Sequence, residues 1–214
     1  MSKPPFSQGA AILAGLSLAT VGASAASAAD QIETPDYEVI ASQKVAEAPG
    51  QTIEVRQYAP MLVAEVTVAA ESRDAASSKG FHPLADYIFG NNRPQEEIAM
   101  TAPVTTTAEG AGAKIAMTAP VTTAETGEGD YTVRFMMPDK YTLDTLPKPV
   151  NPDVRLREME ERALVALRFT GRRDAARIDA AEKAVTAYIE DKGLTPSGPF
   201  ATAGYDGPRT APED

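Results

Sequence analysis

A nine-residue segment that occurs twice without change constrains the fold of this chain more than any other feature. Residues 98–106 and 115–123 both read IAMTAPVTT, and the second copy begins 17 residues after the first. Between them, residues 108–113 are small and Gly-rich, which is typical of a loop that joins two strands. We therefore expect two extended segments, 98–106 and 114–123, that pair as a hairpin.

Pairing of this kind brings the two copies side by side on one pleated surface. Met100 then lies beside Met117 on the same face of the hairpin, in some register. Pro103 and Pro120 each remove one backbone donor from the ladder, so we expect each proline at an edge or a bulge.

The segments on either side of the duplicated motif show alternating hydrophobicity and one helical pattern. Apolar and polar residues alternate over residues 53–56 and 62–68, which predicts half-buried strands. Residues 74–89 carry Phe81, Leu84 and Ile88 at helical spacing, and Gly90 follows as a stop signal. Gly80 and Pro83 fall inside this helix, so we expect an irregular first turn or a kink.

The second half of the chain follows a similar plan. The pattern predicts strands at 131–137, 154–159, 162–170 and 199–204, a mostly loop segment at 141–152 and a helix at 174–192. Strand–strand–helix–strand, written twice, is typical of split βαβ units. The predicted fold class is therefore α+β: two pseudo-repeated units form a distorted antiparallel β-barrel or curved sheet, with two helices packed on it.

The first 50 residues differ in composition from the rest. Residues 1–28 contain one basic residue, an apolar stretch and a small-residue site, Ala26-Ser27-Ala28, which together predict a signal peptide that is removed. An uncleaved membrane anchor is the alternative, although Gly, Ser and Thr dilute the stretch. We expect a tether at 29–50 with one short strand at 37–41, a domain at 51–208 and a flexible tail at 209–214.

Composition excludes several classes of site. The chain has no cysteine and a single histidine, which rules out disulfides, covalent c-type haem attachment and any site that needs two imidazoles. Without Lys3, 19 basic residues face 30 acidic ones. A domain this acidic repels phosphate backbones, so nucleic acid is not an expected partner. We also expect no stable membrane insertion once the leader is removed.

Several short motifs, taken together, resemble the SOUL haem-binding protein family over residues 52–208. They are EVRQY at 54–58, Phe81 with Leu84 and YIFG at 87–90, the doubled IAMTAPV, FMMP at 135–138, YTLDTLPKP at 141–149 and GYD at 204–206. The resemblance implies a distorted barrel of two repeated units with two helices. It also implies non-covalent binding of haem or a related tetrapyrrole in an apolar groove beside the first helix.

The resemblance carries over to the helix residues that match it, which are Phe81, Leu84, Tyr87 and Ile88. Iron ligation varies within the family, so no ligand is fixed by the motifs. Two departures matter: Pro83 falls inside the helix, and the tail after residue 206 lacks the basic end of many members.

A haem site needs apolar walls and cations near the two propionates. Met100, Met117, Phe135 and Met137 are candidate walls, although alternating apolar residues also serve as ordinary core. The candidate cations flank the predicted strands and helix, and each could equally be a solvated surface charge. They are Arg56, Lys79 and Lys140.

His82 is the candidate iron ligand because it is the only imidazole and lies on the predicted helix. An exposed turn residue before a proline is the alternative interpretation. Tyr87 is a second candidate donor, through its oxygen. Haem could also bind by burial of its apolar face alone.

The sequence thus predicts an exported haem- or tetrapyrrole-binding protein, periplasmic or secreted, that buffers, carries or scavenges its ligand. No G-x-S-x-G, Walker or G-x-G-x-x-G motif is present and no catalytic residue is assigned. Two alternatives stay open: an effector-binding-like module or hydrolase for another apolar compound, and a protein-interaction module. The oligomeric state is left open.

Overall fold

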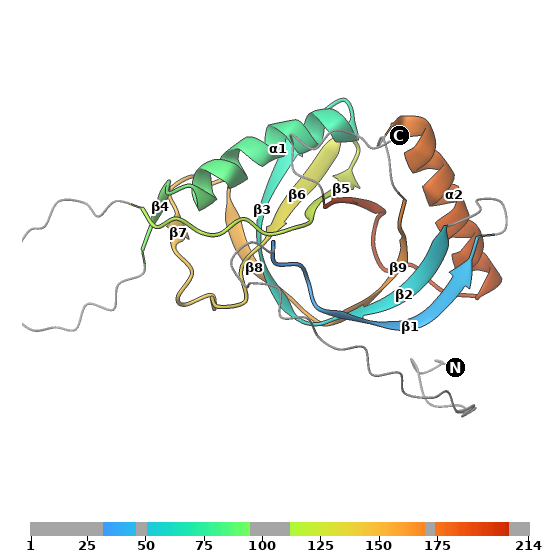
Figure 1. Cartoon of the computed structure of the whole chain (residues 1–214). Coiled ribbons are helices and arrows are strands. Elements are labelled where there is room, and N and C mark those ends of the chain that lie inside the picture. The colour runs from blue at the N-terminus through green and yellow to red at the C-terminus, as the bar shows by residue number, and fades with distance from the viewer. Residues whose placement is uncertain (1–31, 46–50, 95–111, 170–173, 206–214) are drawn as a thin grey trace, which may run out of the picture. The chain divides into compact units, whose positions relative to one another are not determined.

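The fold is given by a computed structural model that describes residues 32–45, 51–94, 112–169 and 174–205. Two helices, α1 (Arg73–Ile88) and α2 (Ala175–Asp191), accompany the strands. The strands are β1 (Tyr37–Lys44), β2 (Thr52–Tyr58), β3 (Met61–Ala69), β4 (Asn92–Arg93), β5 (Val121–Gly127), β6 (Asp130–Met136), β7 (Lys148–Pro149), β8 (Arg155–Met159), β9 (Arg162–Leu167) and β10 (Ala201–Gly204) (Figure 1).

The strands form three antiparallel sheets in the described part of the chain. The orders are β1-β2-β9, β10-β5-β6-β3-β8 and β4-β7. The expected α+β class with two helices and antiparallel strands is confirmed. A closed barrel is not: the described strands form separate curved sheets with free edges. The pseudo-repeat stays a prediction.

One two-stranded ladder links the two larger sheets. Ile53 to Tyr58 pair with Leu167 to Arg162, and Met61 to Glu65 pair with Met159 to Arg155. The register is the same on both sides of Ala59-Pro60, so no residue is gained or lost where the ladder bends. β2–β3 and β8–β9 therefore act as two long bent strands whose halves belong to different sheets (Figure 1).

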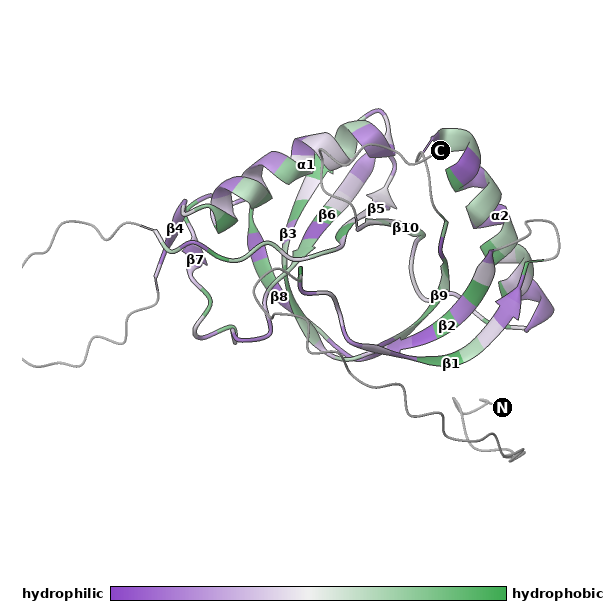
Figure 2. Ribbon diagram, viewed as in Figure 1, coloured by the Kyte–Doolittle hydropathy of each residue, from purple (hydrophilic) through white to green (hydrophobic). Residues whose placement is uncertain are grey.

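The core lies between α1 and the five-stranded sheet. α1 packs on β3, β5 and β6, whereas α2 packs on β9. Along β3 and β6 hydrophobic residues alternate with hydrophilic ones, as Figure 2 shows, and the hydrophobic set faces α1. The buried cluster comprises Ala64, Val66, Leu84, Tyr87, Ile88, Ile115, Val133, Phe135, Met137, Leu146 and Val154.

Helix α1 runs without interruption through both residues that were expected to disturb it. Ser72 caps its start by accepting a hydrogen bond from the Ala75 backbone N–H at 3.2 Å. Gly80 is buried where the helix approaches β6, and Pro83 lies inside the helix. Gly90, at φ +122°, adopts a backbone conformation that favours glycine just beyond the helix. The helix is thus continuous through both residues, and Gly80 allows a close helix–sheet contact; the kink stays a prediction.

The second copy of the duplicated motif forms a strand only in its last three residues. β5 begins at Val121, and the residues before it are not part of a named strand. Both edges of β5 are occupied, by β6 and β10, so residues 121–123 do not pair with the first copy as expected. The first copy, with Met100 and Pro103, lies outside the described residues.

The segment expected to be a tether contains a full strand. β1 extends over Tyr37–Lys44, longer than the predicted 37–41, and pairs with β2 along its length with one irregularity between Val39 and Ala41. Before it, Glu33 pairs with Thr118 in an isolated bridge. Residues from Ile32 onward therefore belong to the same unit as the sheets.

Candidate functional site

The face of α1 that was expected to border a groove is packed into the core. Leu84, Tyr87 and Ile88 are at most 2% exposed and lie in one cluster with Phe135 and Met137. Phe81 is half-buried, with its ring centroid 5.3 Å from that of Phe135. The structure thus brings these residues together, as the resemblance implied. Among the described residues, however, they contact one another and leave no room between helix and sheet for a macrocycle.

Tyr87 uses its hydroxyl within this core. The hydroxyl donates a hydrogen bond to the Pro147 carbonyl at 2.7 Å, and the side chain is 1% exposed. Burial, with a smaller contribution from Tyr141, raises the pKa of Tyr87 above its ordinary range. The Tyr87 oxygen therefore keeps its proton, which it donates to the Pro147 carbonyl. A buried, protonated hydroxyl is unfavourable for iron ligation.

The opposite face of α1 presents a second set of candidates, which we call the outward stripe: Lys79, His82 and Phe89. They share one face because residues three and seven apart in a helix lie above one another. All three are exposed, Phe89 by 58%. The His82 ring meets Phe81 edge-on at 6.4 Å, and its imidazole makes no hydrogen bond within the described part of the chain. Lys79 donates to the Ala69 carbonyl at 3.0 Å.

Two further predicted residues lie on the surface. Met117 is 44% exposed, so it does not act as a buried wall. Lys140 is exposed and places its ammonium 5.0 Å from the centre of the Tyr141 ring. Neither residue is brought into the packed cluster around Leu84.

Arg56 lies on β2, whereas α1 packs on the other sheet, so the structure separates Arg56 from the helix residues. It is 9% exposed and pairs with Glu54 at 2.7 Å, while Tyr58 accepts a bond at 3.3 Å. Burial alone lowers the pKa of Arg56. The hydrogen bonds to Tyr58 and Glu54 outweigh it, and the pKa lies above its ordinary value. The Arg56 guanidinium is therefore already engaged by Glu54 and Tyr58.

An aromatic cluster surrounds Arg56 that the sequence patterns did not reveal. The Tyr37 ring lies 4.4 Å below the guanidinium carbon and 5.1 Å from the Tyr58 ring. Tyr205, after β10, joins them: burial first, then nearby Tyr58, raises the pKa of Tyr205 to about 12. Tyr58 and Arg56 stand two residues apart on a strand, which was the available signal for a shared face.

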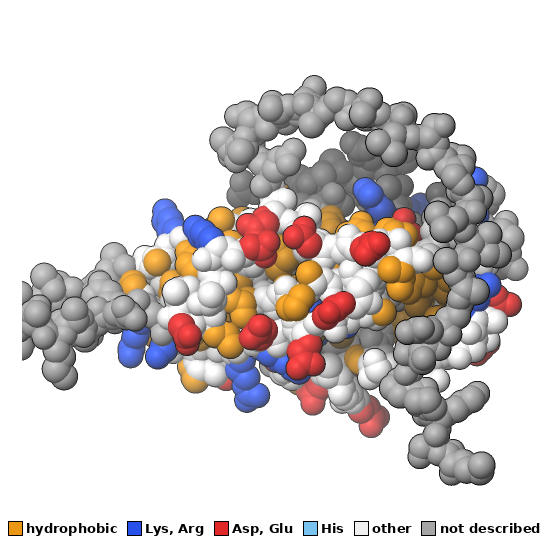
Figure 3. All heavy atoms as spheres, turned by 90° about the horizontal axis from the view of Figure 1, so that it is seen from below, with side chains coloured by type: hydrophobic (Ala, Val, Ile, Leu, Met, Phe, Trp, Pro, Cys, Tyr) orange, Lys and Arg blue, Asp and Glu red, His pale blue; other side chains and the backbone are white. Residues whose placement is uncertain are grey.

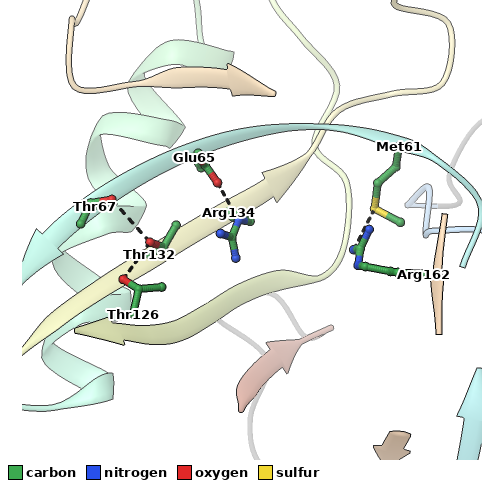
Figure 4. A network of polar contacts seen from close by, with 7 residues as sticks. All are labelled: Met61, Glu65, Thr67, Thr126, Thr132, Arg134 and Arg162. Atoms are coloured by element: carbon green, nitrogen blue, oxygen red, sulfur yellow. Dashed lines mark hydrogen bonds and ion pairs between the residues drawn. The ribbon is translucent and has the colours of Figure 1, made fainter. Parts of the chain in front are cut away.

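A polar network covers the face of the five-stranded sheet that points away from α1. Glu65 and Arg134 form an ion pair of 2.7 Å across β3 and β6, and Thr132 lies between Thr67 and Thr126 (Figure 4). Arg162 donates to the Met61 sulfur at 3.8 Å. Burial, and then the charge of Arg134, lowers the pKa of Arg162. Arg162 has no carboxylate partner within the described residues.

A cavity of about 330 Å³ lies where the long ladder bends, and we call it the strand-bend cavity. Of the predicted site residues only Met137 lines it. Its other lining residues are Pro35, Asp36, Ala59, Pro60, Met61, Leu62, Met136, Pro138, Asp139, Tyr141, Thr142, Leu143 and Glu158.

Two further properties concern the described residues. No group of three His, Cys, Asp or Glu side chains gathers there in a way that suits a metal ion. A single imidazole such as His82 fits the axial position of a haem, where the porphyrin supplies the remaining ligands. Neither described helix has the length and apolar character required to cross a membrane.

Comparison with known proteins gives a consistent family. The model of the SOUL heme-binding protein family matches residues 32–213. Heme-binding protein 2 of Homo sapiens is 28% identical over 189 residues, which cover 87% of this chain and 84% of that protein. Heme-binding protein 2 of Mus musculus is 25% identical over 178 residues, covering 83% and 80%. This chain belongs to the SOUL heme-binding protein family.

Proposed function

We propose that this protein binds haem or a related tetrapyrrole without covalent attachment and holds it on the outward stripe of α1. The observation that carries the proposal is the match to a heme-binding family over residues 32–213. The absence of cysteine excludes thioether attachment. The role we propose is to buffer, carry or scavenge the ligand after export, since residues 1–28 have the pattern of a signal peptide.

The geometry favours the outward stripe over the inward face. The inward residues are packed against one another, whereas His82 and Phe89 are exposed. These two residues are separated by two helical turns, about 10 Å along the axis. An imidazole at one end can ligate iron while an exposed aromatic ring at the other contacts the macrocycle edge.

Charge on the stripe is mixed: Lys79 lies before His82, and the exposed Asp86 falls between His82 and Phe89 on the same face. Lys79 lies one turn before His82, within reach of a carboxylate on a macrocycle centred there. Its ammonium bonds only a backbone carbonyl in the described structure, so it has donors left for a propionate. Because the site lies on the surface, we expect the bound haem to remain partly exposed to solvent.

Haemin titration of the purified chain tests the proposal. We expect a saturable Soret change with about one equivalent bound. A parallel titration with metal-free protoporphyrin separates iron ligation from apolar burial, because only haemin gains from His82. If neither porphyrin saturates the protein and both are lost on a desalting column, the proposed function is wrong.

A further inference from the structure

We propose that the strand-bend cavity is a second binding site, independent of the tetrapyrrole stripe, for a small organic ammonium ion with an apolar body. No member of the outward stripe lines this cavity. The two sites therefore differ in location, and the following observations show that they also differ in chemistry.

The cavity walls combine polar groups with adaptable apolar side chains. Met61, Met136 and Met137 are among the lining residues, together with Leu62 and Leu143, although the side chain of Met137 also belongs to the packed core. Methionine side chains fit irregular ligands because they bend at three bonds and are polarizable. Such walls bury a small hydrocarbon or aromatic body.

Every charged residue that lines the cavity is acidic. Asp36, Asp139 and Glu158 come from three separate segments, the approach to β1, the loop after β6 and strand β8. None of the three carboxylates forms an ion pair within the described residues. Figure 3, a view from below, shows acidic side chains interspersed with hydrophobic ones on the described part of the side it presents. A cation on an apolar ligand is complementary to this lining.

Tyr141 supplies a second element of cation recognition. Tyr141 is among the lining residues, and the Lys140 ammonium already stands 5.0 Å from the centre of its ring. The ring face is thus placed where a positive charge is attracted to it. Lys140 competes with a bound ammonium for this ring, and Arg162, which contacts the Met61 sulfur, is a second cation near the cavity.

Size and charge separate this ligand from haem. A volume of about 330 Å³ is near the lower end of the range of about 300–1,000 Å³ for small-molecule sites. Two propionates would face three carboxylates there. A compact monocation satisfies both limits, and a tetrapyrrole dianion satisfies neither.

The test uses the full chain with methyl-labelled methionines and three probes of matched shape: phenethylammonium, phenethyl alcohol and 3-phenylpropionate. We expect phenethylammonium to shift the methyl signals of Met61, Met136 and Met137 saturably, while that of Met117 stays in place. The alcohol should bind more weakly and the carboxylate weakest. Equal binding of ammonium and alcohol, or no saturable shift, overturns the proposal.

Variants assign the charge effect to the cavity. Glu158→Gln and Asp139→Asn should each weaken phenethylammonium binding about two- to fivefold, as expected for partly exposed ion pairs. Glu160→Gln, an exposed residue outside the cavity, is the matched control and should change nothing. Lys140→Met should strengthen binding by freeing the Tyr141 ring. Unchanged affinity in all three cavity variants also overturns the proposal, whatever the outcome of the haemin titration.

Discussion

Gly80 on α1 lies so close to Val133 on β6 that a Cβ atom at position 80 would come within 2.5 Å of Val133 Cγ2. Both residues are buried, and Val133 is 0% exposed. Val133 is β-branched and held in the sheet, so it has little freedom to move aside. This contact explains why a glycine occurs in the middle of the helix.

Gly80→Ala should therefore destabilise the protein by about 1–3 kcal/mol through overpacking. Helix propensity alone predicts the opposite, since Ala is favoured over Gly by about 1 kcal/mol in a helix interior. Urea unfolding followed by circular dichroism measures the difference. Ser78→Ala, on the exposed side of the same helix, is the control and should stay within about 0.5 kcal/mol of the parent. A stabilised Gly80→Ala variant would show that helix propensity outweighs the contact.

His82→Ala should change the Soret spectrum of the haem complex and lower affinity for haemin, because the variant removes the only imidazole. Affinity for metal-free protoporphyrin should stay the same. The apo protein should keep its unfolding free energy, since His82 is exposed. Identical haemin spectra in parent and variant would exclude axial ligation by His82.

Tyr87→Phe should cost about 1–3 kcal/mol of unfolding free energy, because the buried Pro147 carbonyl loses its donor. The haem spectrum should not change, since the hydroxyl faces the core. A lost or shifted Soret band in a folded variant would instead make Tyr87 an iron ligand.

The same tyrosine predicts a pH dependence. Its pKa is raised in the folded state by burial, so the folded protein binds this proton more tightly than the unfolded chain. The contribution to stability is therefore complete below about pH 10, the ordinary tyrosine pKa, and is lost as the pH rises toward the folded pKa. Unfolding free energies measured at pH 8 and pH 11 should fall less in Tyr87→Phe than in the parent. Parallel losses in the two proteins would contradict this assignment.

Glu65→Gln should destabilise the sheet by leaving Arg134 without its carboxylate, at a cost of about 1–3 kcal/mol for these partly buried groups. The positive charge of Arg162 repels that of Arg134, and this repulsion is no longer offset once Glu65 is neutral. Adding Arg162→Met to Glu65→Gln should therefore recover part of the loss. A double-mutant cycle of Arg134→Met and Arg162→Met in the Glu65→Gln background, followed by chemical unfolding, measures the coupling between the arginines; strict additivity there would show that they do not interact.

Local sequence patterns predicted most elements of this fold. Residues 174–192 were expected to be a helix, and α2 covers Ala175–Asp191. Alternation placed β3 and β6 equally well. Strands β4 and β7 were missed because two residues carry no periodicity. The extended segment predicted at 114–123 begins before β5, which covers Val121–Gly127. Local sequence cannot separate the two, because an extended backbone without partners has the same pattern as a paired strand.

The candidate site was harder to infer for a physical reason. Apolar spacing identified Leu84, Tyr87 and Ile88 as one face of α1, but the same spacing serves a ligand groove and a packed core. Only coordinates show that these side chains fill the space themselves. The strand-bend cavity joins residues 35–36, 59–62, 136–139, 141–143 and 158, which come from segments far apart in sequence, so no local motif could mark it.

The shared register of β2–β3 with β9–β8 limits which changes in length this family can accept. Adding one residue to one of these strands on one side of Ala59-Pro60 would turn the remaining side chains to the opposite face, exposing core residues such as Ala64 and Val66. Insertions and deletions should therefore be excluded from residues 53–65 and 155–167 in functional descendants. The number of residues in each of the two bent strands is thus fixed by the shared register. We expect variation in length in the connections outside these strands.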